Sequence, residues 1–352
     1  MQCYSKENSL NSLPVELLIE IIKQMDLNSL MEFRKTNKIA NEIFEQSDEY
    51  LLLKYNLTSR YNLLYLYVDY NSTTKEKITT YYEKIYNEKK IIVDNKKIKE
   101  LPLLPNVENL VCFNNQLKRL PNGMKSLTKL KCSINQLTSL PDDMNSLKVL
   151  YCFSNRLTRL PTGMTSLEDL KCSTNQLTKL PEDMKSLTSL YCSNNKLTRL
   201  PGGMTSLEYL SCGNNQLTRL PDDMNSLITL NCYSNQLTRL PSDMNSLKYL
   251  GCGNNQLTSL PSELISLVNL DCQDNQLTRL SENTTKSLET IYCQNNQLTS
   301  LPDGMISLKK LFCGNNQLTK LPEDMISLET LNCVNNQLTE LPDDMIHPLK
   351  KP

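Results

Sequence analysis

The chain has no tryptophan, one histidine, five phenylalanines and nine glycines among its 352 residues. The single histidine, His347, offers no partner for a metal cluster or an acid–base pair, and the scattered glycines form no phosphate-binding loop. No charge sign dominates, because 38 basic and 38 acidic side chains cancel. This balance argues against a nucleic-acid-binding or membrane-binding surface. We therefore expect no cofactor, no metal site and no enzymatic activity.

Long apolar runs are also missing. No stretch reaches the roughly 18 apolar residues that a membrane-spanning helix needs. The segment from Leu17 to Ile22 is interrupted by Glu20 and is too short for the apolar region of a signal peptide. With no export signal, the 13 cysteines are expected to stay reduced, in the cytosol or nucleus. We assign the protein to the cytoplasm.

What the chain has in abundance is one repeat. The block L-x-x-L-x-C-x-x-N-x-L-x-x-L-P-x-x-M occurs twelve times and restarts every 20 residues. One clear copy contains Leu127, Leu130, Cys132, Asn135, Leu137, Leu140, Pro141 and Met144. A single unit of this size cannot bury its apolar face alone, so a period this regular predicts a solenoid of stacked coils.

The spacing within the block predicts the geometry of each coil. Leu130 and Cys132 alternate with exposed positions, which indicates a short strand, and stacking such strands in parallel would line a concave face with a sheet. Asn135 and its copies, Asn115 through Asn336, fall where the strand ends, and an amide there can satisfy buried backbone groups. The Leu-Pro step must be extended, so the outer face has no room for a long helix. The cysteines Cys112 to Cys333 form one column that we expect inside the core, as small buried hydrophobes.

This pattern resembles leucine-rich repeats of the short class, with cysteine in the third leucine position, over about 101–346. The resemblance implies an α+β solenoid: a curved stack with a parallel sheet on its concave face, preceded by a small all-α domain. We assign the solenoid to 91–352. It begins with a degenerate cap repeat, 91–106, in which Lys96 replaces the asparagine, and twelve repeats follow.

The first ninety residues differ in kind and are expected to be helical. We divide them into a tail (1–10), a helical domain (11–50) and a helical linker (51–90). Ser12 is a natural N-cap with Pro14 in the first turn. Leu17, Ile21 and Met25 follow at helical spacing, and a second amphipathic helix begins near Leu30, after a break at Asp26 and Asn28.

The segment 11–38 resembles an F-box. The family's Leu-Pro start is Leu13-Pro14, and its D-L-x-x-L step is Asp26, Leu27 and Leu30. The usual valine-cysteine pair is replaced by Lys35-Thr36, and the customary tryptophan is missing. The residues that the resemblance assigns to adaptor binding are Leu13, Pro14, Leu17, Ile21, Ile22 and Leu30.

An F-box followed by leucine-rich repeats implies a substrate receptor of a cullin-type ubiquitin ligase. The F-box would bind a Skp1-like adaptor, and the solenoid would hold a target protein. The composition, rich in Asn, Lys, Ile and Tyr, also resembles F-box/leucine-rich-repeat proteins of giant DNA viruses of amoebae, which would place the protein in the host cytoplasm. The alternative is a plain interaction scaffold whose helical N-terminus only caps the repeats.

The concave face is the predicted partner-binding surface, because aromatic side chains recur on its strands. These residues are Tyr151, Phe153, Tyr191, Tyr209, Tyr233, Tyr249, Tyr292 and Phe312. We expect Tyr209, Tyr233 and Tyr249 to form rims around a floor of small residues, a shape suited to hot-spot binding. The floor would consist of Ser211, Gly213, Gly251 and Gly253. Alternatively, these tyrosines only cover neighbouring strands.

Two features fall on the other faces of the stack. A basic column (Arg159, Lys179, Arg199, Arg219, Arg239) precedes an acidic band (Asp142, Asp143, Glu182, Asp183, Asp222, Asp223), which predicts solvated charge ladders more than a phosphate-tracking stripe. The coil 281–300 is irregular. Cys272 and Cys293 are 21 residues apart, and Ser281 and Thr284 replace the usual Pro and Met. We expect it to be the weak point of the stack, or else a bulge that faces a partner.

Overall fold

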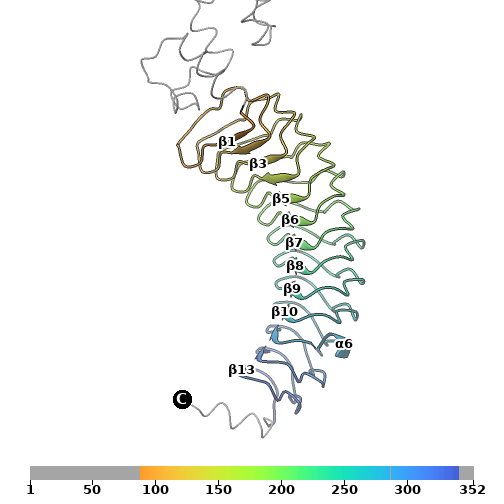
Figure 1. Cartoon of the computed structure of the whole chain (residues 1–352). Coiled ribbons are helices and arrows are strands. Elements are labelled where there is room, and N and C mark those ends of the chain that lie inside the picture. Colours follow the sequence, from red (N-terminus) through yellow and green to blue (C-terminus); the bar gives the residue numbers. More distant parts are fainter. Residues whose placement is uncertain (1–87, 286, 341–352) are drawn as a thin grey trace, which may run out of the picture.

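The computed structural model describes residues 88–285 and 287–340. The predicted tail, F-box-like domain and nearly all of the helical linker lie outside this range. The described part is one parallel sheet of thirteen strands whose spatial order follows the sequence (Figure 1). The strands are β1 (Lys90–Ile92), β2 (Asn109–Val111), β3 (Lys129–Lys131), β4 (Val149–Tyr151), β5 (Asp169–Lys171), β6 (Ser189–Tyr191), β7 (Tyr209–Ser211), β8 (Thr229–Asn231), β9 (Tyr249–Gly251), β10 (Asn269–Asp271), β11 (Thr290–Tyr292), β12 (Lys310–Phe312) and β13 (Thr330–Asn332).

In β1 to β12 the central residue of each strand is buried in the core, and the flanking residues, apart from the buried Gly251, are at least partly exposed. Leu130 is paired in register with Leu150, and Leu150 with Leu170, and all three are fully buried. The other apolar positions of the block stack in the same way, so a single continuous core runs from Ile91 to Met325. Every coil is therefore covered by copies of itself, as the repeat period predicts.

The stack curves, and its strands lie along the inner side of the arc (Figure 1). The outer side consists of turns and extended segments. Within the described ranges its only helix is α6 (Glu282–Thr285), which projects on the outer side of the coil that contains the extra residue (Figure 1). The predicted solenoid with a concave parallel sheet is thus confirmed.

The asparagine column closes each coil onto the preceding one. Asn135 Oδ1 accepts a hydrogen bond from the Leu117 backbone N–H at 2.9 Å, and its Nδ2 donates to the carbonyls of Cys112 and Cys132 at 2.9 and 3.1 Å. The same set of bonds is repeated up to Asn336. The predicted role of this amide is confirmed, since the backbone groups of the turn are satisfied by it.

The degenerate repeat forms the first coil of the sheet. β1 pairs with β2 and includes Lys90, the last residue of the predicted helical linker. Its missing asparagine is replaced from the next coil, because Asn115 accepts hydrogen bonds from the backbone of Lys96 and Ile98 at 3.1 and 3.0 Å. The first coil therefore receives its side-chain acceptor from Asn115, just as the second coil receives one from Asn135.

The cysteine column lies inside. Cys112 to Cys313 are buried, and Cys333 in the last described coil is partly exposed. Desolvation raises the pKa of Cys132, Cys172 and Cys232 to about 12. In the described part of the chain, no helix is long and apolar enough to cross a membrane. The same residues contain no cluster of three or more His, Cys, Asp or Glu placed to bind a metal.

Candidate partner-binding surface

The structure places all eight predicted aromatic residues on the concave strands or directly after them. Four of them are exposed: Tyr191 (36%), Tyr209 (41%), Tyr233 (37%) and Tyr249 (37%). Tyr151, Phe153, Tyr292 and Phe312 are half-buried. The six predicted adaptor-binding residues, Leu13, Pro14, Leu17, Ile21, Ile22 and Leu30, lie outside the described residues.

The predicted arrangement of aromatic rims around a glycine floor is wrong, because two rings lie on the floor. A Cβ added to Gly213 would stand 2.4 Å from Tyr233 Cε1, so the ring of Tyr233 occupies the space directly above this glycine. The Tyr233 hydroxyl accepts a hydrogen bond from Asn214 Nδ2 at 2.7 Å. The ring of Tyr249 likewise leans over Gly251, 3.3 Å from the position of a Cβ there. The space above these two glycines is therefore occupied by tyrosine rings, whereas Gly253 is approached by Gln273 and Asp271, and Tyr209 is the most exposed of the three tyrosines.

Lysine side chains lie between the aromatic rings at the N-terminal end of the face. Lys131, Tyr151, Lys171 and Tyr191 are paired in register on β3 to β6. The Nζ atoms of Lys131 and Lys171 lie 4.9 and 4.7 Å from the centre of the Tyr151 ring. Lys171 Nζ also lies 5.0 Å from the centre of the Tyr191 ring. We call these four residues the lysine–tyrosine ladder.

Tyr151 is fixed at its other end by a carboxylate. Its hydroxyl donates to Asp169 Oδ2 at 2.5 Å. This hydrogen bond, helped by partial burial, raises the pKa of Tyr151 to about 12, so the phenol stays protonated and continues to donate. The sequence pointed to the tyrosines of this column but not to Lys131 and Lys171. Their alternation with tyrosine at a spacing of one coil was the signal that could have found them.

A second aromatic group occupies the C-terminal end. The rings of Tyr292 and Phe312 stack with centroids 4.8 Å apart and planes inclined by 13°. Their strands, β11 and β12, are paired so that these two residues are direct neighbours. Stacking satisfies one face of each ring, so this pair is a covered apolar contact more than an open anchor.

The charged columns away from the sheet form the predicted solvated ladders. Arg159 pairs with Asp142, Arg199 with Glu182 and Arg239 with Asp222, at 2.8, 2.6 and 3.0 Å, and all of these side chains are exposed. The guanidinium groups lower the pKa of Asp142 and Asp222. The remaining acidic residues of the band have a structural role, since Asp143, Asp183 and Asp223 accept hydrogen bonds from the N–H of a glycine in the preceding coil. These charges are used within the molecule.

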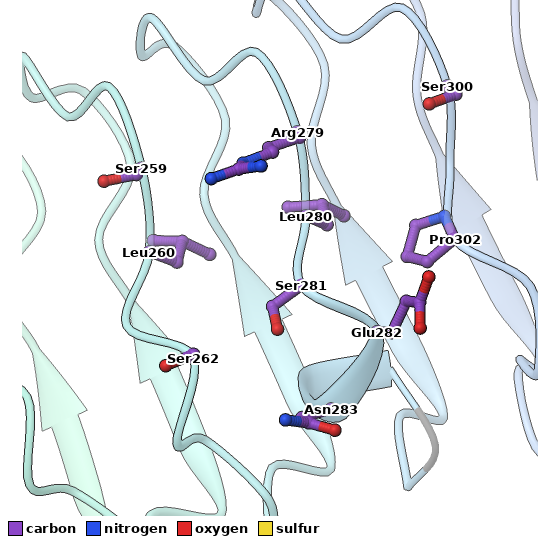
Figure 2. Close-up of a pocket in the computed structure, with 10 residues that line it drawn as sticks. All are labelled: Ser259, Leu260, Ser262, Arg279, Leu280, Ser281, Glu282, Asn283, Ser300 and Pro302. Atoms are coloured by element: carbon purple, nitrogen blue, oxygen red, sulfur yellow. The ribbon is translucent and has the colours of Figure 1, made fainter.

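The irregular coil borders a hollow of about 660 Å³ (Figure 2). Arg279 points toward the Ser259 side, whereas Glu282 points toward Pro302 (Figure 2). Arg159, Arg199 and Arg239 each pair with an acidic residue 17 positions earlier, but Ser262 occupies that position relative to Arg279, as Gly202 does relative to Arg219. The lining residues are Ser259, Leu260, Ser262, Arg279, Leu280, Ser281, Glu282, Asn283, Ser300 and Pro302.

Two family models match the chain. An F-box domain model matches residues 10–52, and a model of leucine-rich repeats in two copies matches 185–223 and 306–349. Together they support an F-box/leucine-rich-repeat protein. Both families are typically non-enzymatic interaction modules. No curated protein matches the sequence.

Solved structures with a similar fold include three bacterial proteins. The leucine-rich effector protein YopM of Yersinia pestis is 27% identical, with a TM-score of 0.57, over 77% of this chain and 90% of that one. The leucine-rich-repeat protein LIC12759 of Leptospira interrogans is 26% identical, with a TM-score of 0.56, over 76% and 83%. The functional domain of InlJ from Listeria monocytogenes, described as including a cysteine ladder, is 27% identical, with a TM-score of 0.63, over 76% and 66%. The chain is similar to these proteins in its solenoid.

Proposed function

We propose that this protein is a substrate receptor of a cullin-type ubiquitin ligase. Residues 10–52 would bind a Skp1-like adaptor, and the concave face would recruit the protein to be ubiquitinated. The observation that carries the proposal is the F-box match N-terminal to a solenoid whose concave strands present aromatic and lysine side chains. The chain itself would perform no chemistry, and recognition would be its entire contribution.

The concave face suits recognition because its exposed positions are free to vary. Stability resides in the Leu, Cys and Asn columns, which are buried or bonded to the backbone in every coil. The strand residues that flank the central leucine are not needed for stacking, as Lys131, Tyr191, Ser211 and Asp271 show by occupying one column. Aromatic residues at such positions are the side chains that most often dominate binding energy.

The test is co-purification of the full chain with a Skp1-like adaptor. The variant Leu13→Ala with Pro14→Ala should lose the adaptor. The matched variant Tyr209→Ala with Tyr233→Ala changes two side chains on the solenoid and should retain it. Absence of adaptor binding by the unmodified chain at micromolar concentrations would favour the alternative, an interaction scaffold in which the N-terminal segment only caps the repeats.

We also propose a cytoplasmic location, in the host if the protein is viral. The thiol column supports a reducing compartment, since the twelve cysteines Cys112 to Cys333 are all free. Fractionation of cells that express the full chain tests this proposal.

A further inference from the structure

We infer that the lysine–tyrosine ladder on β3 to β6 holds an acidic, extended segment of the partner protein, with Lys131 and Lys171 binding its carboxylates. This inference rests on the proposed function in so far as the concave face must meet a protein, but it does not depend on the adaptor. The sequence alone predicted a binding surface centred on Tyr209, Tyr233 and Tyr249. This inference moves the centre of that surface to the coils N-terminal to these tyrosines.

The ladder presents two cations held in position before any partner arrives. Lys131 and Lys171 approach the same ring, Tyr151, at 4.9 and 4.7 Å, and Lys171 is shared with Tyr191. A lysine on an open surface samples many rotamers, and fixing it on binding costs conformational entropy. Contact with an aromatic ring restricts that motion beforehand while leaving the ammonium N–H groups free to donate. Asp169 extends this order by holding the Tyr151 hydroxyl.

The charge of the patch selects an acidic ligand. The strands β3 to β5 carry three ammonium groups, those of Lys129, Lys131 and Lys171, and one carboxylate, that of Asp169. The opposite sign appears further along the arc, where Asp271 lies on β10 and Asp274 follows it. An acidic segment would be attracted to the first region and repelled from the second, so the face also sets where along the arc the segment binds.

Backbone strain in the same coils supports a binding role. Ile134 and Thr174 adopt left-handed conformations, with φ of 55° and 56°, and Ile134 is 44% exposed. A β-branched residue is poorly suited to this region of φ/ψ space. Most other coils place asparagine here, with Ser234 and Asp274 as exceptions, and Asn214 uses its side chain to bond Asn194 in the preceding coil at 3.0 Å.

Over β3 to β5 this asparagine ladder is replaced by Ile134, Ser154 and Thr174. These coils therefore give up a stabilising residue beside the lysine–tyrosine ladder and gain an exposed apolar side chain. Strain of this kind concentrates at functional sites, where the surface serves binding more than stability. Ile134 would contact an apolar residue that accompanies the acidic side chains.

The experiment measures binding of a fluorescently labelled hexaglutamate peptide to the full chain by anisotropy. Lys131→Gln with Lys171→Gln should weaken binding by about tenfold or more, because it removes both carboxylate-binding groups. The control, Lys310→Gln with Lys320→Gln, removes the same charge from exposed positions outside the ladder and should leave binding within about twofold. Tyr151→Leu should also weaken binding, although it removes no charge, since both lysines lose the ring that positions them.

Equal losses in the ladder and control variants would overturn the inference, as would unchanged binding in the ladder variant or no binding to the unmodified chain. Circular dichroism checks that each variant keeps its fold. Leu13→Ala with Pro14→Ala separates the two proposals, since it should leave peptide binding intact. Peptide binding without adaptor binding would reject the ligase assignment and retain the acidic-segment site. Adaptor binding without peptide binding would retain the ligase assignment and reject the acidic-segment site.

Discussion

At the scale of single residues, the asparagine column shows most directly why this sequence repeats. Asn275 is 9% exposed and bonds four backbone groups: it accepts from the Leu257 N–H at 3.0 Å and donates to the carbonyls of Cys252, Cys272 and Gln273, each at 3.1 Å. A shorter or apolar side chain cannot make these bonds. Every coil needs this amide to pair the buried backbone groups of its turn, and for this reason the role of the asparagine could be predicted from its position alone.

Replacement of Asn275 by alanine should lower the free energy of unfolding of the solenoid by about 1–3 kcal/mol, because buried backbone groups lose their partners. Urea unfolding followed by circular dichroism measures the change. Gln276→Ala is the control, since the neighbouring Gln276 is exposed and should have little effect. Equal shifts for the two variants would mean that the amide is not needed for closure of the coil.

The buried thiols predict a loss of stability in alkali. Their pKa in the folded state is raised, to about 12 for Cys132, Cys172 and Cys232, above an ordinary value of 9.0. Above pH 9 the unfolded chain releases these protons and the folded chain retains them, so the free energy of unfolding falls as pH rises. The loss is on the order of 1 kcal/mol per thiol at one pH unit above the ordinary value. Below the ordinary pKa of 9.0, the thiols are protonated in both states, and their contribution to the free energy of unfolding is fully present.

Urea midpoints measured at about pH 8 and pH 10 test this linkage. The triple variant Cys132→Ala, Cys172→Ala and Cys232→Ala should be less stable at the lower pH because it leaves cavities, yet it should lose less stability between the two pH values. An identical pH dependence in the variant would show that other groups control alkaline unfolding. Thiol titration gives a second measurement: the buried column should react slowly in native protein and rapidly in denaturant.

At the scale of elements, the coil 281–300 is predicted to open most easily. It contains α6 and borders the hollow around Arg279, and it lacks the proline that the flanking coils have at Pro261 and Pro302. Hydrogen exchange should be faster in 281–300 than in the coils on either side. Ser281→Pro should slow it and add about 0.4–1 kcal/mol of stability by restricting the unfolded chain. Uniform protection along the stack would contradict this prediction.

The repeated block predicts some features of the fold but not the arrangement of the side chains on its concave face. Strand positions, sheet order, the buried thiols and the asparagine contacts follow from one repeated block, because each coil solves the same packing problem. The pairing of Lys171 with Tyr151 and the placement of the Tyr233 ring over Gly213 depend on side-chain rotamers between neighbouring coils. The repeat does not constrain those positions, so spacing identified the face but not the arrangement of its side chains.

At the scale of the whole molecule, the concave face contains two neighbouring regions of different chemistry. The lysine–tyrosine ladder lies on β3 to β6, and the more exposed tyrosines Tyr209, Tyr233 and Tyr249 lie on β7 to β9. They belong to adjacent coils of one continuous sheet. A partner segment that follows the arc from β3 to β9 would therefore contact the lysine–tyrosine ladder and then the exposed tyrosines.

The variant Tyr209→Ala, Tyr233→Ala and Tyr249→Ala therefore tests whether the second region contributes to capture of the target protein. We expect loss of target binding with adaptor binding retained, because the three tyrosines are 37–41% exposed and aromatic residues dominate interface energies. Tyr292→Ala is the matched control, since its ring is already stacked on Phe312. Pull-down of the target by the full chain, with the adaptor followed in parallel, gives both readouts at once. Undiminished capture by the triple variant would restrict the partner to the lysine–tyrosine ladder, or move it to the outer charged columns if the ladder variant also binds normally.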